Sequence, residues 1–154
     1  MTRAGEPALH SPVADGPSEE QEGPCHVAPR PNADARKVAR AEKNLESQLP
    51  TRKLGLSEAQ AWLTEIAHAE DIDPPLIIHG RLSRCTHAAA VPEHHVIVVA
   101  SKRPTQLTLL HELAHFMGSM GHGSRFQELL TDLLRRHLSI HHATTFRDAL
   151  HIMS

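Results

Sequence analysis

Five consecutive residues, His111-Glu112-Leu113-Ala114-His115, suggest chemistry more directly than any other part of this 154-residue chain. On a helix, four residues at about 100° each return the second histidine to nearly the same face, about 6 Å along the axis. Two imidazoles placed in this way can bind one Zn²⁺, and a glutamate directly after the first histidine can take a proton from an attacking water molecule. The pattern H-E-x-x-H therefore predicts a metal site with Glu112 as general base.

A third ligand is expected, because a catalytic zinc ion usually has three protein ligands and one water. The chain supplies His122 shortly after the motif, and glycines on both sides of it free the backbone for a sharp return. Phe126 then begins the next apolar stripe and is expected to anchor the returning segment beneath the metal. The spacing predicts that His111, His115 and His122 converge on one point.

Apolar periodicity predicts the elements that must position this motif. The motif helix should begin at Ser101 or Thr105 and stop at Gly118, and Ser124 should cap the next helix with Gln127 completing a capping box. Pairing of short β-branched runs predicts a small antiparallel sheet of about three strands, so the expected fold class is α+β. The other expected helices span residues 34–48, capped by Asp34, 57–70 and 143–152, and the expected strands span residues 76–79, 84–89 and 95–100.

Residues 1–34 differ from the rest of the chain. They contain six of the eleven prolines and six acidic against two basic residues, with few large apolar side chains. Such a segment buries too little surface to offset its ordering entropy. We therefore expect a disordered acidic tail over residues 1–34 and one metallohydrolase domain over residues 35–154.

Composition excludes several classes of protein. A formal net charge of −2 excludes the strongly basic balance of a general nucleic-acid coat, and no apolar run approaches the roughly 18 residues of a membrane span. Residues 1–9 lack the apolar segment of a secretory signal, which predicts a cytoplasmic protein without a membrane partner. Cys25 and Cys85 form no C-x-x-C pair and are expected to be free thiols.

The stretch from about Val96 to Leu138 resembles the small zincin-like metallohydrolases related to the SprT-like proteases. It is most similar to short metallohydrolases of actinobacteria and their phages, in which Leu-His-Glu-Leu-Ala-His is followed by His-Gly-x-x-Phe. The resemblance covers less than half of the chain. It implies a minimal zincin-like fold and one zinc ion per chain, and it implies no particular substrate. The residues it implies are His111, His115 and His122 as ligands and Glu112 as base.

Two departures limit what the resemblance implies. The position of the third metzincin histidine is Gly121 in this chain, and no Met-turn follows. The chain also lacks the added DNA-binding segments of SprT-like repair proteases, so nucleic acid is not the expected partner. A peptide or protein substrate is expected instead, held along the edge of the strand at residues 95–100. Tyrosine is absent, so candidates to stabilise the oxyanion are Arg84, His94, His95, Arg103, His141 and His142.

Two alternative functions stay open at the level of the sequence. Metal-dependent endoribonucleases of the YbeY type also present three histidines, but their spacing is one residue shorter and they lack the glutamate of H-E-x-x-H. The presence of Glu112 therefore favours hydrolysis of a peptide or amide bond. A non-catalytic or regulatory zincin-fold protein is the second alternative, with an acid such as Glu128 as the third ligand.

Overall fold

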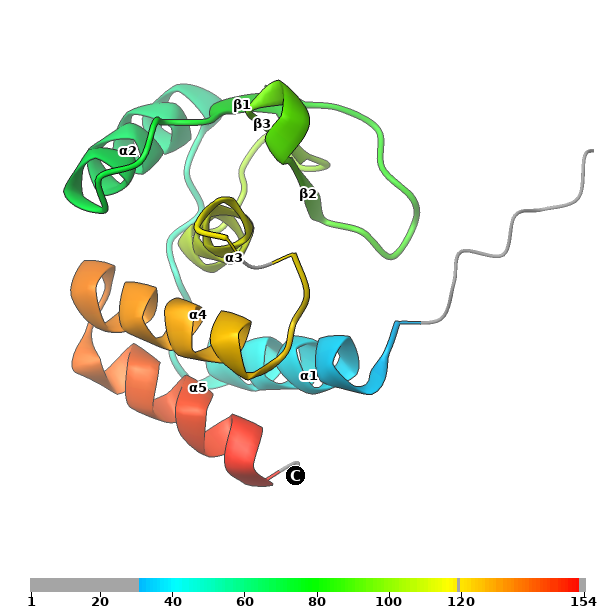
Figure 1. Cartoon of the computed structure of the whole chain (residues 1–154), viewed down its shortest axis with the longest axis vertical. Coiled ribbons are helices and arrows are strands. Elements are labelled where there is room, and N and C mark those ends of the chain that lie inside the picture. The colour runs from blue at the N-terminus through cyan, green and yellow to red at the C-terminus, as the bar shows by residue number, and fades with distance from the viewer. Residues whose placement is uncertain (1–30, 119, 153–154) are drawn as a thin grey trace, which may run out of the picture. The chain divides into compact units, whose positions relative to one another are not determined.

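The computed structural model describes residues 31–118 and 120–152, which lie in one compact unit (Figure 1). The tail predicted over residues 1–34 falls outside this range up to Arg30, and so does Cys25. Within the described part the fold is α+β, as predicted, with five α-helices and one three-stranded sheet. In chain order the elements are α1 (Ala33–Gln48), α2 (Leu56–Ala69), β1 (Leu76–His79), β2 (Ala88–Val91), the 3₁₀ turn η1 (Pro92–His94), β3 (Val96–Val99), α3 (Gln106–Phe116), α4 (Ser124–His137) and α5 (Ile140–Ile152).

The sheet is mixed rather than antiparallel, so this part of the prediction is wrong. The strand order is β1-β3-β2, with β3 antiparallel to β2 and parallel to β1. The reason lies in the loop over residues 80–87. It crosses the end of the sheet where Val99 pairs with both His79 and Ala88, and this leaves room for β3 to return between its two neighbours.

The two outer strands, β1 and β2, differ in whether the backbone groups of their outer edges are already hydrogen-bonded. On β1, the Gln60 side chain from α2 accepts a hydrogen bond from the Ile77 N–H (2.8 Å) and donates one to the Pro75 carbonyl (3.1 Å). These contacts cover backbone groups that a further strand would need. β3 is paired on both sides, so the substrate edge predicted for residues 95–100 does not exist there. The edge strand that faces the motif helix is β2.

The outward groups of β2 follow from its register with β3. The Ala100 N–H donates to the His87 carbonyl, so His87 and Ala100 form a hydrogen-bonded pair. Such pairs alternate along an antiparallel ladder. The peptide groups of Ala88 and Ala90 therefore point away from β3, along the free edge.

Helix α3 is the central element of the unit. Figure 1 shows it between two layers, with the sheet and α2 above it and α1, α4 and α5 below it. Its residues Leu109, Leu110 and Leu113 are completely buried, because both flanks of the helix are covered. Burial on two sides fixes the position of the helix that carries H-E-x-x-H.

Several element ends differ from the prediction. The cap of α1 is Asn32, whose side chain accepts from the Ala35 N–H (2.8 Å), and not Asp34. The predicted capping box of α4 is also wrong. Gly123 occupies the N-cap, and Gln127 donates to the His122 carbonyl (2.9 Å) instead. Thr105 does cap α3, accepting from the Thr108 N–H (3.1 Å).

The strand predicted at residues 84–89 lies later in the chain, at Ala88–Val91. Alanine is a weak strand former, so propensity favours the residues before it. Pairing with the β-branched strand β3 overrides that preference. Helix α5 begins at Ile140, three residues before the predicted start at Ala143.

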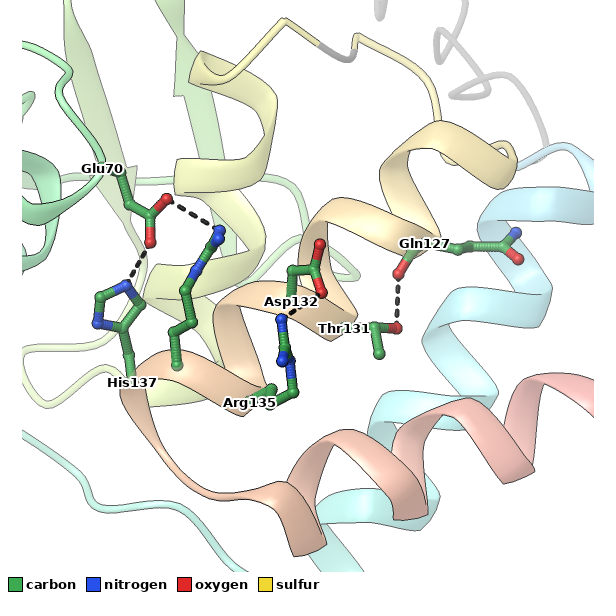
Figure 2. Close-up of polar contacts among 7 residues, drawn as sticks. Glu70, Gln127, Thr131, Asp132, Arg135 and His137 are labelled. Atoms are coloured by element: carbon green, nitrogen blue, oxygen red, sulfur yellow. Dashed lines mark hydrogen bonds and ion pairs between the residues drawn. The ribbon is translucent and has the colours of Figure 1, made fainter.

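Glu70, which ends α2, is hydrogen-bonded to the last turn of α4. Its side chain is 8% exposed, and its carboxylate contacts Nε2 of His137 (2.6 Å) and Nη2 of Arg136 (2.9 Å), as Figure 2 shows. The ion pair between Asp132 and Arg135, in the same view, lies within α4 and is half exposed. Glu70 therefore links the two layers that enclose α3.

None of the helices described reaches the combination of length and hydropathy that a bilayer span requires.

Candidate metal centre

Two local features of the sequence bring the three histidines together. His111 and His115 lie on successive turns of α3, one helical repeat apart. After the C-cap at Met117, Gly118 adopts φ +101°, a conformation that residues with a Cβ rarely adopt. The chain turns there and returns to α4, and His122 lies immediately before the N-cap of that helix.

The three imidazoles converge as the spacing predicts. Each of His111, His115 and His122 is half-buried and offers one ligand atom, and these atoms all lie within 4.8 Å of one another. The Nε2 atoms of His111 and His122 are 3.2 Å apart. Two nitrogens that bind one tetrahedral zinc ion at ~2.0–2.1 Å are about 3.3–3.4 Å apart, so this pair has the required separation. The three histidines can hold a metal ion.

Phe126 forms the floor of this cluster. Its ring is completely buried and its centroid lies 4.9, 4.7 and 4.8 Å from the rings of His111, His115 and His122. The rings of Phe126 and His115 are stacked, with 27° between their planes. A rigid apolar surface beneath all three imidazoles limits their rotation and excludes water from one side of the site.

Glu112 lies beside the cluster and is buried, with 6% of its surface exposed. Its carboxylate accepts a hydrogen bond from the Ala90 N–H, one of the outward-pointing groups of β2. Burial raises the pKa of the Glu112 carboxyl above its usual value, although His111 and the Ala90 hydrogen bond oppose the shift. The pKa is thereby moved toward the range in which a carboxylate can both accept and return a proton.

The histidines of the cluster differ in their pKa. Burial, together with the neighbouring His111 and His115, lowers the pKa of His122 to about 4, so this imidazole is neutral at physiological pH. Burial also acts to lower the pKa of His111, but the hydrogen bond and charge of Glu42 outweigh it and raise that pKa. A neutral imidazole is the form that binds a metal ion.

The cluster opens into a cavity of about 690 Å³. One wall is the face of α1 that carries Ala35, Ala39, Glu42 and Glu46, and the opposite wall is formed by the loop before β2 and by Ala88. His111, Glu112 and His122 lie among its lining residues. A substrate in this cavity would therefore meet the candidate metal site and the free edge of β2 together.

Some residues considered from the sequence lie elsewhere. Glu128 and Asp132 line a separate pocket between α1, α4 and α5, and neither belongs to the cluster that could hold a metal ion. None of the six predicted oxyanion candidates lines the cavity. His95 instead contacts the Asp73 carbonyl (2.9 Å), and His142 contacts the Ser139 hydroxyl (2.7 Å).

Sequence reasoning missed three residues at the cavity. Glu42 contacts His111 from α1, and Cys85 and His87 line the cavity from the loop before β2. Glu42 lies 69 residues before His111, so no local spacing could indicate the contact. Cys85 is an exposed free thiol, as predicted.

Comparison of the chain with protein-family models, with curated proteins and with solved structures finds no match. The resemblance to SprT-like metallohydrolases therefore stays a prediction, and the geometry of the site carries the functional proposal.

Proposed function

We propose that this protein is a zinc-dependent hydrolase that cleaves peptide bonds. The observation that carries the proposal is the convergence of His111, His115 and His122 next to the buried carboxylate of Glu112, at the wall of an open cavity. Three histidines leave a fourth tetrahedral position open, which is the arrangement of a catalytic rather than a structural zinc site. This geometry supports the interpretation of H-E-x-x-H as a zincin-like motif.

The donor set favours zinc over a hard cation. All three candidate ligands are imidazole nitrogens, whereas Ca²⁺ and Mg²⁺ prefer oxygen ligands. The separation of 3.2 Å between Nε2 of His111 and Nε2 of His122 agrees with tetrahedral coordination. When bound, the zinc ion would polarise the substrate carbonyl and lower the pKa of a water molecule toward ~7.

Glu112 supplies the proton transfers. Its carboxylate accepts the proton of the attacking water and then delivers it to the amine that leaves. The raised pKa of this carboxyl supports both steps, because a base with a very low pKa would return the proton poorly. The Ala90 N–H holds one carboxylate oxygen, which fixes the side chain between the sheet edge and the histidines.

The free edge of β2 is suited to an extended peptide. The Ala90 N–H is bonded to Glu112, but Ala88 directs its N–H and C=O outward at the cavity, where an extended backbone can add as a further strand. The small alanine side chains of β2 let another backbone approach closely. His87 lines the same wall and is our candidate for the group that contacts the developing oxyanion.

The charges of the cavity favour peptides over RNA. Among the described residues that line it, Glu42, Glu46 and Glu112 are acidic and Lys43 is basic. An RNA-cleaving site needs positive charge to hold the phosphate backbone. The endoribonuclease alternative therefore finds little support in this cavity.

A paired cleavage screen tests the proposal. The full chain, loaded with one equivalent of zinc, is incubated with a diverse peptide library and, separately, with structured and single-stranded RNA. We expect cleavage of peptides that a zinc chelator abolishes and that added zinc restores. Cleavage of RNA alone would overturn the proposal in favour of a nuclease. Zinc binding without cleavage of either substrate would favour a regulatory protein.

A further inference from the structure

Glu42 makes a close polar contact to the histidine cluster from another helix, α1. Its Oε1 atom lies 2.5 Å from Nδ1 of His111, and the two side chains are 20% and 17% exposed. We propose that Glu42 is a positioning residue of the metal centre, which holds His111 in one tautomer and one ring orientation. This inference rests on the metal centre of the proposed function, but not on the reaction catalysed there.

The two nitrogens of His111 face different partners. Nε2 lies 3.2 Å from Nε2 of His122, on the side where the candidate ligand atoms converge, and Nδ1 faces Glu42. A neutral imidazole has one N–H, and a carboxylate can only accept a hydrogen bond. The N–H therefore lies on Nδ1, where it donates to Glu42, and the lone pair of Nε2 points to the metal position.

Helix α1 can hold this carboxylate rigidly. Val38, Ala41 and Leu45, which surround Glu42 on the helix, are completely buried in the core. One turn later, Glu46 accepts hydrogen bonds from the backbone and hydroxyl of Thr51, which ties the end of α1 to the chain that follows. Glu42 thus acts from a helix that the core holds in place.

Glu46 offers a matched control for the test. It lies on the same face of α1 and lines the same cavity, but its hydrogen bonds go to Thr51 and not to a histidine. A general effect of removing an acidic charge from the cavity would appear in Glu46→Gln as strongly as in a Glu42 variant. An effect that acts through His111 would appear in the Glu42 variants alone.

The experiment measures metal affinity and imidazole tautomer on the full chain. Zinc affinity is determined by competition with a chromophoric chelator for the parent, Glu42→Gln, Glu42→Ala and Glu46→Gln. Loss of a carboxylate partner typically weakens metal binding by roughly 10–100-fold, which we expect for Glu42→Ala. Glu42→Gln keeps an acceptor for the Nδ1 N–H and should recover part of that loss, whereas Glu46→Gln should stay within about twofold of the parent.

Nitrogen-15 NMR of the imidazoles supplies a readout that a merely structural role would not change. In the zinc-loaded parent we expect a protonated Nδ1 and a metal-bound Nε2 on His111. Melting temperatures of the metal-free variants show whether each one folds, and Glu42→Gln replaces Glu42→Ala where the alanine variant does not. A metal-bound Nδ1 on His111, or equal affinities of the Glu42 and Glu46 variants, would overturn the inference.

The outcomes separate this inference from the proposed function. If the parent binds zinc and the Glu42 variants lose affinity, but no peptide is cleaved, the positioning role stands and the hydrolase proposal fails. If peptides are cleaved and the Glu42 variants bind zinc as the parent does, the reverse holds. A parent chain that binds no zinc overturns both.

Discussion

Neighbouring carboxylates and rings give the histidines of the centre different proton affinities. The pKa of His111 is raised because Glu42 outweighs burial, and the pKa of His122 is lowered to about 4 by burial and by the two other histidines. His111 therefore holds its second proton up to a higher pH than an ordinary histidine does, and His122 releases its second proton at a lower pH. A metal ion that binds at Nε2 of His111 would have to compete with a proton at that atom.

We predict that zinc affinity falls as the pH is lowered from 8 to 6. A raised pKa places the competing protonation of His111 above the ordinary value of about 6.5, and the neutral His122 adds no competition until about pH 4. Calorimetric titrations in two buffers of different ionisation enthalpy should show proton release on binding near neutral pH. An affinity that stays constant from pH 8 to pH 5 would contradict ligation by these histidines.

The lowered pKa of His122 also affects the stability of the metal-free fold. Between about pH 6.5 and pH 4 the unfolded chain protonates His122 and the folded chain does not, so this group lowers stability as the pH falls through that window. His111 acts in the opposite sense. Its raised pKa stabilises the fold at low pH, and this contribution is lost as the pH rises above 6.5.

Glu112→Gln should separate folding from chemistry. Glutamine matches the size of glutamate but cannot accept the proton, so we predict unchanged zinc content and a loss of cleavage by roughly 10²–10⁴-fold. Burial raises the pKa of Glu112, so the neutral carboxyl stabilises the fold at low pH, and this contribution to stability is lost as the carboxyl ionises with rising pH. At neutral pH the variant should therefore melt at the same temperature as the parent or above it.

His115→Ala is the contrasting variant, because it should lose zinc and stability together. Cleavage by Glu112→Gln at the parent rate would show that Glu112 is not the base.

At the scale of the elements, the link between α3 and α4 decides where the third histidine lies. Gly118 ends α3 at φ +101°, and its added Cβ would meet only Arg125 at an ordinary 3.9 Å. The obstacle to substitution is therefore backbone strain and not space. Gly121, in the same link, shows no positive φ and has no atom within 4 Å of an added Cβ.

We predict that Gly118→Ala costs about 1–3 kcal/mol of stability and weakens zinc binding, because the strained turn relaxes and moves His122. Gly121→Ala is the matched control and should change neither quantity appreciably. Chemical denaturation and chelator competition measure the two effects. Equal behaviour of both variants would show that the turn at Gly118 does not position His122.

At the scale of the whole unit, contacts between distant elements hold the site in place. The core joins residues of α1, α2, β3, α3, α4 and α5 in one cluster. Glu70 adds a polar link between the end of α2 and the end of α4, the two helices that lie on opposite sides of α3 (Figures 1 and 2). The histidines of α3 and His122, just before α4, thus keep their relative position through packing around α3.

Glu70→Ala should destabilise the fold by about 1–3 kcal/mol, because it removes the hydrogen bonds of a side chain that is 8% exposed and leaves His137 without this partner. Asp132→Ala is the control. Its pair with Arg135 is half exposed, and its loss should cost less than about 0.5 kcal/mol. Chemical denaturation of the metal-free chain distinguishes the two, and similar losses would show that Glu70 is no special link.

The sequence by itself determined what depends on local spacing. Helical repeats place His111 and His115 on one face, and the glycines around His122 permit its return, so the histidine cluster was predictable. The helices and the strands β1 and β3 also follow from periodicity within short windows. Their ends were less predictable, because Asn32 and Asp34 are both residue types that cap helices well and only Asn32 takes that place in the structure.

Only the tertiary structure decided what depends on contacts between distant segments. Three features are of this kind: the parallel pairing of β1 with β3, the position of β2 at the edge of the sheet, and the contact of Glu42 with His111. The last of these joins residues 69 positions apart. Periodicity carries no information on such contacts, because many pairings bury the same apolar residues equally well. The loop over residues 80–87 crosses the end of the sheet and so places β2 against α3. The packing of α1 places Glu42 beside the histidines.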